Sequence, residues 1–126
     1  MIRRIGLEDG NPLKLPMAPA VWAGNYLFVS GQAALDEDGA VIDGGIKPQA
    51  HLTIQRLISV LEHAGCTLDH VVKAMVWLDD PRDFFAFNKV YARYFGDAPP
   101  ARSTMVSPLV LDGKVEIELV AYKSTK

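Results

Sequence analysis

The chain has 126 residues, 49% of them hydrophobic and 22% charged, with a formal net charge of −2 at pH 7. This balance is typical of a globular protein and excludes an intrinsically disordered one. No long basic run provides the field of a nucleic-acid binder, and no segment approaches the ~20 apolar residues that cross a membrane. A single cysteine, Cys66, excludes an internal disulfide, and no apolar signal-peptide stretch follows Met1. We therefore expect one soluble, cytoplasmic domain over residues 1–126, without nucleic-acid or membrane partners.

The first half of the chain is predicted to form two strands and a helix. Residues 2–7 form the first strand, and residues 26–30 are rich in β-forming side chains that Gly31 terminates. The apolar period then becomes helical, with matching positions at Ile54, Leu57, Ile58 and Leu61. This pattern predicts a helix over 48–64, with Gly65 as its stop signal.

The second half is predicted to add a strand, a helix and two more strands. Residues 71–78 form an apolar strand, and a helix over 83–95 carries an aromatic stripe of Phe84, Phe87, Tyr91 and Tyr94/Phe95. Two strands over 102–111 and 114–122 flank Asp112-Gly113, a dipeptide that is typical of a two-residue hairpin turn.

This order of elements predicts an α+β fold with two layers, in which two helices cover one face of a mixed sheet. The strand over 71–78 is apolar on both faces, with Val72, Ala74, Val76 and Leu78 on one and Val71, Met75 and Trp77 on the other. The second face needs a cover, and we expect another copy of the chain to provide it. The alternative is a central strand that loops shield.

Arg102 and two glutamates are the candidate functional side chains. Pro99-Pro100 fixes the backbone that approaches Arg102, whose planar donor fork matches a carboxylate. Glu116 and Glu118 share one face of their strand, opposite the apolar residues 115, 117, 119 and 121. A carboxylate in a seam between subunits can activate a water. The alternative for all three residues is a solvated surface position.

A metal site is not expected. His63, Cys66 and His70 are spaced like metal ligands, but Gly65 breaks the helix between them and no fourth ligand is near. We interpret Cys66 as a structural thiol because no activating base is evident.

Seven short stretches, in order, resemble the reactive-intermediate deaminase family (RidA, or YjgF-like). They are Pro19-Ala20-Val21 with Gly24, residues 27–32, 60–65 and 71–73, Asp83-Phe84 with Asn88, Tyr91, Tyr94 and Phe95, residues 100–103, and residues 115–121. The resemblance implies a chorismate-mutase-like α+β fold and a homotrimer with a site in each subunit interface. It also implies hydrolysis of reactive 2-enamines and 2-imines, such as 2-iminopropanoate, to 2-oxo acids and ammonia without a metal or cofactor.

The same resemblance assigns roles to individual residues. Arg102 would clamp the substrate carboxylate, and Glu116 would orient the attacking water. The remaining pocket residues that it implies are Met17, Ser30, Gly31, Asn88 and Thr104. Of these, Thr104 would contact the carboxylate through its backbone amide.

Two positions depart from the family pattern. Met17 stands where the family often has tyrosine, which makes the expected pocket more apolar, and Thr104 stands where it often has cysteine. Met17 favours an alternative function, a non-catalytic member that binds small carboxylates or acts as a chaperone-like surface. A third function, ribonuclease activity, is disfavoured by the acidic charge balance.

The predicted hairpin also predicts where the site forms. A tight turn at Asp112-Gly113 places Leu109 opposite Glu116, and Arg102 then lies seven residues away, roughly 23 Å along the strand. We therefore expect Arg102 and Glu116 to remain apart in one chain and to converge only between two subunits.

Overall fold

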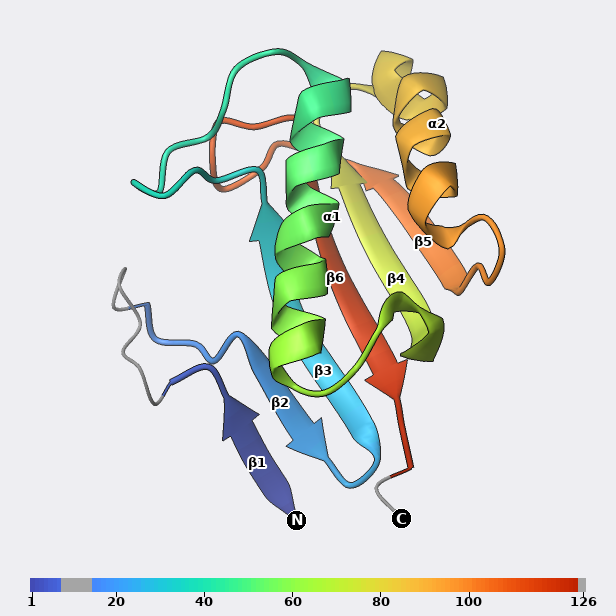
Figure 1. Cartoon of the computed structure of the whole chain (residues 1–126). Helices are drawn as coiled ribbons and strands as arrows, with labels where there is room; N and C mark the ends of the chain where they lie inside the picture. Colours follow the sequence, from blue (N-terminus) through green and yellow to red (C-terminus); the bar gives the residue numbers. More distant parts are fainter. Residues whose placement is uncertain (8–14, 125–126) are drawn as a thin grey trace.

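The structure, a computed structural model, describes residues 1–7 and 15–124 (Figure 1). Its strands and α-helices are, in chain order, β1 Ile2–Ile5, β2 Ala20–Ala23, β3 Tyr26–Ala33, α1 Ile46–His63, β4 Val71–Leu78, α2 Phe84–Phe95, β5 Ala101–Val106 and β6 Val115–Tyr122. Both predicted helices and the predicted strand over 71–78 are confirmed as α1, α2 and β4. Neither helix in the described part of the chain has the length and hydropathy needed to cross a bilayer.

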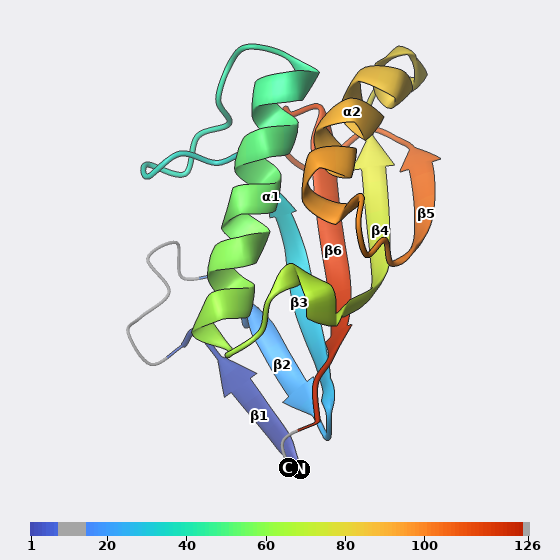
Figure 2. The same ribbon diagram turned by 45° about the vertical axis from the view of Figure 1, so that its right-hand side comes forward.

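The strands form one mixed sheet in the order β1-β2-β3-β6-β4-β5. Only β4 and β5 run parallel, and the other neighbours are antiparallel. Both helices lie on the same side of the sheet, side by side (Figures 1 and 2). This arrangement confirms the predicted α+β fold, with two helices on one face of a mixed sheet.

The core lies between the helices and the sheet. Its buried side chains follow helical spacing in α1 and α2 and alternate along β6; they include Ala50, Ile54, Leu57 and Leu61, then Phe87, Val90 and Phe95, and Val115, Ile117, Leu119 and Ala121. Burial of each large apolar side chain stabilises the fold by about 1.5–3 kcal/mol. A one-residue slip of β6 would expose its whole apolar set, so this burial fixes the register of the sheet.

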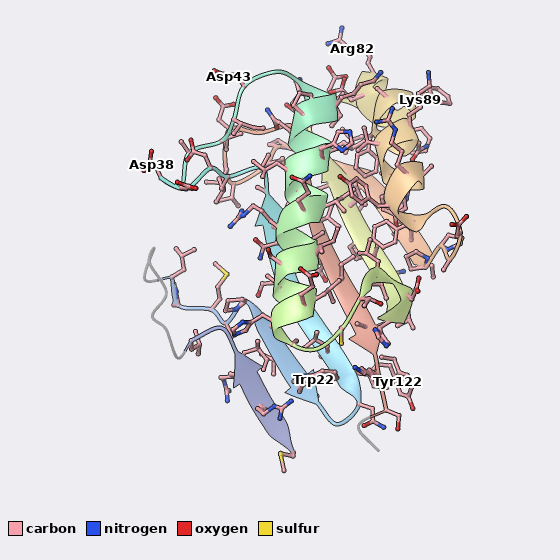
Figure 3. The ribbon with its side chains drawn as sticks, viewed as in Figure 1. Trp22, Asp38, Asp43, Arg82, Lys89 and Tyr122 are labelled. Atoms are coloured by element: carbon pink, nitrogen blue, oxygen red, sulfur yellow. The ribbon has the colours of Figure 1, made fainter. Side chains whose placement is uncertain are left out.

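The opposite face of the sheet carries no helix among the described residues (Figure 2). Met75 and Trp77 are half-buried on it, and Tyr26, Phe28 and Tyr122 at one end are 47%, 49% and 42% exposed. Tyr122 lies at the end of the sheet far from the labelled charges Asp43, Arg82 and Lys89 (Figure 3). We call this surface the open face.

The prediction for the start of β4 is wrong for two side chains, because Val71 and Val72 lie on the opposite faces from those expected. Val71 is 5% exposed and belongs to the core, whereas Val72 is 45% exposed. The pairing register between β4 and β6 shifts between Val71 and Lys73. A bulge of this kind inserts one extra residue into the strand. The side chains before the bulge therefore point to the opposite face from the one that strict alternation predicts.

The predicted hairpin at Asp112-Gly113 is also wrong. β5 ends at Val106 and pairs in parallel with β4, while β6 lies between β4 and β3. Gly113 is absent from the glycines with positive φ, although the tight turn that Asp-Gly favours requires positive φ. β6 alternates between buried and half-buried residues and needs neighbours on both sides, whereas β5 is largely exposed and suits the sheet edge.

The two-residue hairpin occurs at Gly24-Asn25 instead. It joins β2, which the sequence patterns missed, to β3, and its first residue has φ 60°. The Gly-Asn dipeptide is itself a hairpin signal. β2 is only four residues long and follows a proline-rich stretch, which concealed it.

Candidate functional site

Arg102 lies on the helix-covered face of β5, the edge strand. Parallel pairing with β4 places it beside the buried Ala74. Its guanidinium carbon is 4.6 Å from the ring centre of Tyr91, 5.6 Å from that of Phe87 and 5.8 Å from that of Phe84. Cation–π contacts are worth about 0.5–2 kcal/mol each. They hold the Arg102 side chain against α2.

A hydrogen bond to Asn88 sets the orientation of this guanidinium. Arg102 Nη2 donates to Asn88 Oδ1 at 2.8 Å. Asn88 shares a face of α2 with the three aromatic residues because positions 84, 87, 88 and 91 follow helical spacing. An amide oxygen accepts this bond without neutralising the guanidinium, so the positive charge remains available to a ligand.

The ion pairs of the described residues leave Arg102 without an acidic partner. They join Arg82 to Asp80, and Lys114 to Asp79 and Asp83. A half-buried guanidinium without a counter-charge favours a carboxylate or phosphate ligand, which two parallel N–H donors fit. Thr104 follows on the same face of β5, beside Val76. We call Arg102, Asn88 and Thr104 the arginine half-site.

A second group of expected site residues lies at the irregular end of β3. The register of β3 against β6 shifts between Val29 and Gln32, and Ser30 lies in this bulge. The Ser30 N–H donates to the Pro19 carbonyl at 2.9 Å, and Ser30 Oγ donates to the Ala18 carbonyl at 2.6 Å. These two bonds hold the preceding segment against β3, including Met17, whose side chain is half exposed.

Glu116 lies on the open face of β6, beside Ala33 of β3 and Trp77 of β4. Gly31 makes room for its carboxylate, because a Cβ at position 31 would lie 2.5 Å from Glu116 Oε2. Burial raises the pKa of Glu116, and the negative charge of Glu118 raises it further. A raised pKa makes the carboxylate a better proton acceptor near neutral pH. We call Met17, Ser30, Gly31 and Glu116 the glutamate half-site.

The two half-sites are separated within one chain. Arg102 lies on the helix-covered face of β5, Glu116 lies on the open face of β6, and β4 stands between them. The expectation that these side chains remain apart is therefore correct, but the hairpin register from which it came is wrong. The strand order and the alternation of side chains across the sheet separate them.

The sequence patterns missed the groups that hold both half-sites in place. Phe84, Phe87 and Tyr91 were predicted only as a core stripe, although their helical spacing with Asn88 was a usable signal. Near the bulge, Arg56 Nη1 donates to the Ala33 carbonyl at 2.8 Å, and Gln32 Nε2 donates to the Ser30 carbonyl at 3.4 Å. No pattern pointed to these two contacts, because both bonds end on backbone carbonyl oxygens, which every residue carries.

Cys66 and His70, two of the three residues with metal-ligand spacing, have structural surroundings. Cys66 is 1% exposed, and burial raises the pKa of its thiol. His70 Nδ1 accepts the Thr67 N–H at 2.9 Å and caps a short 3₁₀ turn. Within residues 1–7 and 15–124, no three His, Cys, Asp or Glu side chains lie together as a metal site.

Comparison with known proteins identifies the family. The profile of the family described as Endoribonuclease L-PSP, to which the RidA and YjgF proteins belong, matches residues 14–123. The chain is a RidA-family protein. This RidA-family chain is 43% identical over 110 residues to a RutC family protein of Pyrococcus horikoshii, covering 86% of this chain and 87% of that protein.

Two further relatives carry more specific names. The 2-iminobutanoate/2-iminopropanoate deaminase of the goat, Capra hircus, is 36% identical over 126 residues, covering 98% of this chain and 92% of that protein. The crystal structure of E. coli TdcF with bound serine matches with a TM-score of 0.86 at 28% identity, covering 97% of this chain and 99% of that one. The predicted family and the RidA-like fold are thereby confirmed.

Proposed function

We propose that the protein hydrolyses small 2-imino and 2-enamino acids to 2-oxo acids and ammonia, at a site shared between two copies of the chain. The observation that carries this proposal is the pair of half-sites, one with an uncompensated guanidinium and the other with a half-buried glutamate of raised pKa. The name of the goat relative and the serine in TdcF support a small carboxylate substrate.

A homotrimer would unite the half-sites. The open face exposes Tyr26, Phe28, Tyr122 and Met105, an apolar surface of the kind that a partner subunit covers. β5 is an edge strand. A neighbour that lays this edge against the open face would bring its Arg102 towards Glu116 of the first copy. Three such contacts in a closed ring would give three equivalent sites.

The proposed reaction begins with binding of the substrate carboxylate. Arg102 holds it through two N–H donors, the Thr104 backbone amide adds a third, and Met17 contacts the apolar part of the substrate. Ser30 and Gly31 form the wall beside Glu116. This arrangement places the imine carbon next to the water that Glu116 orients. Such positioning lowers the entropic part of the activation barrier, because the reacting groups are already held together.

Glu116 then acts as general base. It accepts a proton from the water while the oxygen bonds to the imine carbon, and the electron pair of the C=N bond moves to nitrogen. Glu116 returns this proton to nitrogen, which gives the carbinolamine. Glu116 then takes the proton of the carbinolamine hydroxyl and passes it to nitrogen while the C–N bond breaks and the C=O bond forms, so that ammonia and the 2-oxo acid are released. The imine carbon is already electrophilic, so these steps require only positioning and proton transfer, and no metal or cofactor takes part.

A coupled assay tests the activity. A serine or threonine dehydratase produces the imine, and excess semicarbazide traps it as a semicarbazone. We expect the purified protein to reduce semicarbazone formation, and Arg102→Ala to lose this effect while it keeps the fold. If the wild-type protein has no effect, the proposal is wrong for small substrates. Pyruvate binding without activity would instead support the non-catalytic carboxylate binder.

Mixed oligomers test the shared site. Arg102→Ala and Glu116→Gln, each inactive alone, should regain activity when they are unfolded, mixed and refolded together. Random assembly then gives intact Arg102 opposite intact Glu116 at about a quarter of the sites. If the mixture stays as inactive as its components although mixed oligomers form, the two residues act within one chain and the shared site is wrong.

A further inference from the structure

The hydroxyl of Tyr91 is buried beside Arg102, and among the described residues it makes no hydrogen bond of good geometry. Tyr91 is only 7% exposed, and its ring centre lies 4.6 Å from the guanidinium carbon of Arg102. Burial raises the pKa of the phenol, and the charge of Arg102 together with its hydrogen-bonding proximity offsets part of this rise. The hydroxyl is therefore neutral at physiological pH, and it lies close enough to the guanidinium for the two groups to interact electrostatically.

Packing alone does not explain this hydroxyl. The Tyr91 ring stacks on Phe95 at 4.5 Å and contacts Phe87 at 5.6 Å between ring centres, and a phenylalanine would make the same contacts. A buried hydroxyl without a partner costs folding free energy. Tyr94, one turn further along α2, contrasts with it, because its hydroxyl pairs with His51 Nδ1 at 3.0 Å.

The donor count of Arg102 indicates what the hydroxyl can do. A guanidinium has five N–H donors, and Asn88 Oδ1 accepts one of them. A second neutral acceptor on the same side would prevent rotation of the fork and leave two parallel donors for a ligand. The phenol oxygen of Tyr91 is such an acceptor, and unlike a carboxylate it does not neutralise the cation.

We propose that Tyr91 is a positioning residue for Arg102. When a carboxylate engages the guanidinium, the Tyr91 hydroxyl accepts one of its N–H donors and, with Asn88, holds the fork in one orientation. This inference rests on the carboxylate-binding role of Arg102 in the proposed function. It assigns the hydroxyl to ligand affinity and the aromatic ring to the core.

Two matched substitutions on α2 test the inference. Tyr91→Phe and Tyr94→Phe each remove one hydroxyl, and each variant is titrated with pyruvate by calorimetry, melted, and assayed for KM and kcat. We expect Tyr91→Phe to weaken pyruvate binding about tenfold and to raise KM similarly, since hydrogen bonds to charged groups are of this size. Its kcat should change little and its Tm should not fall. Tyr94→Phe should lower Tm and leave pyruvate binding unchanged.

The outcomes separate this inference from the function on which it rests. If the wild-type protein binds pyruvate and Tyr91→Phe binds it equally tightly, the positioning role of Tyr91 is wrong, while the carboxylate site at Arg102 stands. A fall in Tm as large as that of Tyr94→Phe would show that the fold itself pairs the hydroxyl, which also overturns that role. If the wild-type protein and Arg102→Ala both fail to bind pyruvate, the carboxylate site is wrong, and the Tyr91 inference is wrong with it.

Discussion

The arginine half-site and the glutamate half-site are held in place by different means. Side chains hold Arg102: the amide of Asn88 and the rings of Tyr91, Phe87 and Phe84 fix its guanidinium. Backbone geometry holds the glutamate half-site, through the bulge in β3, the bonds from Ser30 to the preceding segment, and the missing Cβ of Gly31.

This difference predicts how each half-site responds to substitution. Changes around Arg102 alter charge and orientation, and they should appear in carboxylate affinity. Changes around Glu116 alter the position and protonation of a base, and they should appear in kcat and in pH dependence. Four substitutions test this division, from the largest expected effect to the smallest.

Glu116→Gln should have the largest effect, a loss of about a hundredfold or more in kcat, because loss of a general base has this magnitude. Pyruvate affinity should change little. Folding raises the pKa of Glu116, so ionisation of this side chain opposes folding. The folded state is therefore favoured at low pH, where Glu116 is protonated, and this contribution is lost as pH rises through the raised pKa. The variant should therefore melt no lower than wild type at neutral pH. A large loss of pyruvate affinity would contradict the division.

Asn88→Asp should weaken pyruvate binding by about ten- to a hundredfold. A carboxylate at 2.8 Å from Arg102 Nη2 would pair with the guanidinium and compete with the ligand. Tm should rise or stay constant because the fold gains an ion pair. Asn88→Ala provides the control and should bind more tightly than Asn88→Asp. The reverse order would show that the neutrality of this contact is unimportant.

Gly31→Ala should lower kcat by about tenfold, since small displacements of a catalytic group are costly. The added Cβ would lie 2.5 Å from Glu116 Oε2, at the free end of a flexible side chain. The carboxylate can move aside, so we expect kcat to fall with little change in Tm. Gly113→Ala is the matched control, because its Cβ would meet neighbours at 3.4 Å or more. Equal kcat values in the two variants would contradict a role for Gly31.

Glu118→Gln should have the smallest effect. The negative charge of Glu118 helps to raise the pKa of Glu116. Without that charge, the pKa of Glu116 falls and the acidic limb of the pH–kcat profile moves to lower pH, while the plateau rate is unchanged. The profile is measured for wild type and variant at equal ionic strength. A shift to higher pH, or no shift, would show that another group controls this limb.

Local patterns predicted the helices well, because their burial follows from spacing along one segment. The stripe of Ile54, Leu57 and Leu61 and the stop at Gly65 identified α1 to within two residues. The Asp112-Gly113 hairpin failed because pairing depends on competition among strands. The buried alternation of β6 requires two neighbours, and this requirement outweighs a local turn preference.

The candidate site was predictable to the extent that it follows sequence motifs. Arg102 and Asn88, predicted from motifs, are joined by a hydrogen bond, and Gly31 packs against Glu116. The aromatic support of Arg102 was missed because a helical stripe looks the same whether it covers a core or a cation. The bulges at Ser30 and at Val72 have no local signature, since each arises from the pairing register of two distant segments.

The position of β6 has a consequence for how the molecule is made. The strand that is synthesised after all the others of this sheet, β6 Val115–Tyr122, lies in its middle, and among the described strands it alone joins β3 to β4. Until β6 is synthesised, strands β1–β3 and strands β4–β5 have no hydrogen-bonded strand pairing between them. The apolar side chains of β3 and β4 then lack the strand that pairs with both. We therefore expect nascent chains to stay sensitive to proteases until β6 has left the exit tunnel.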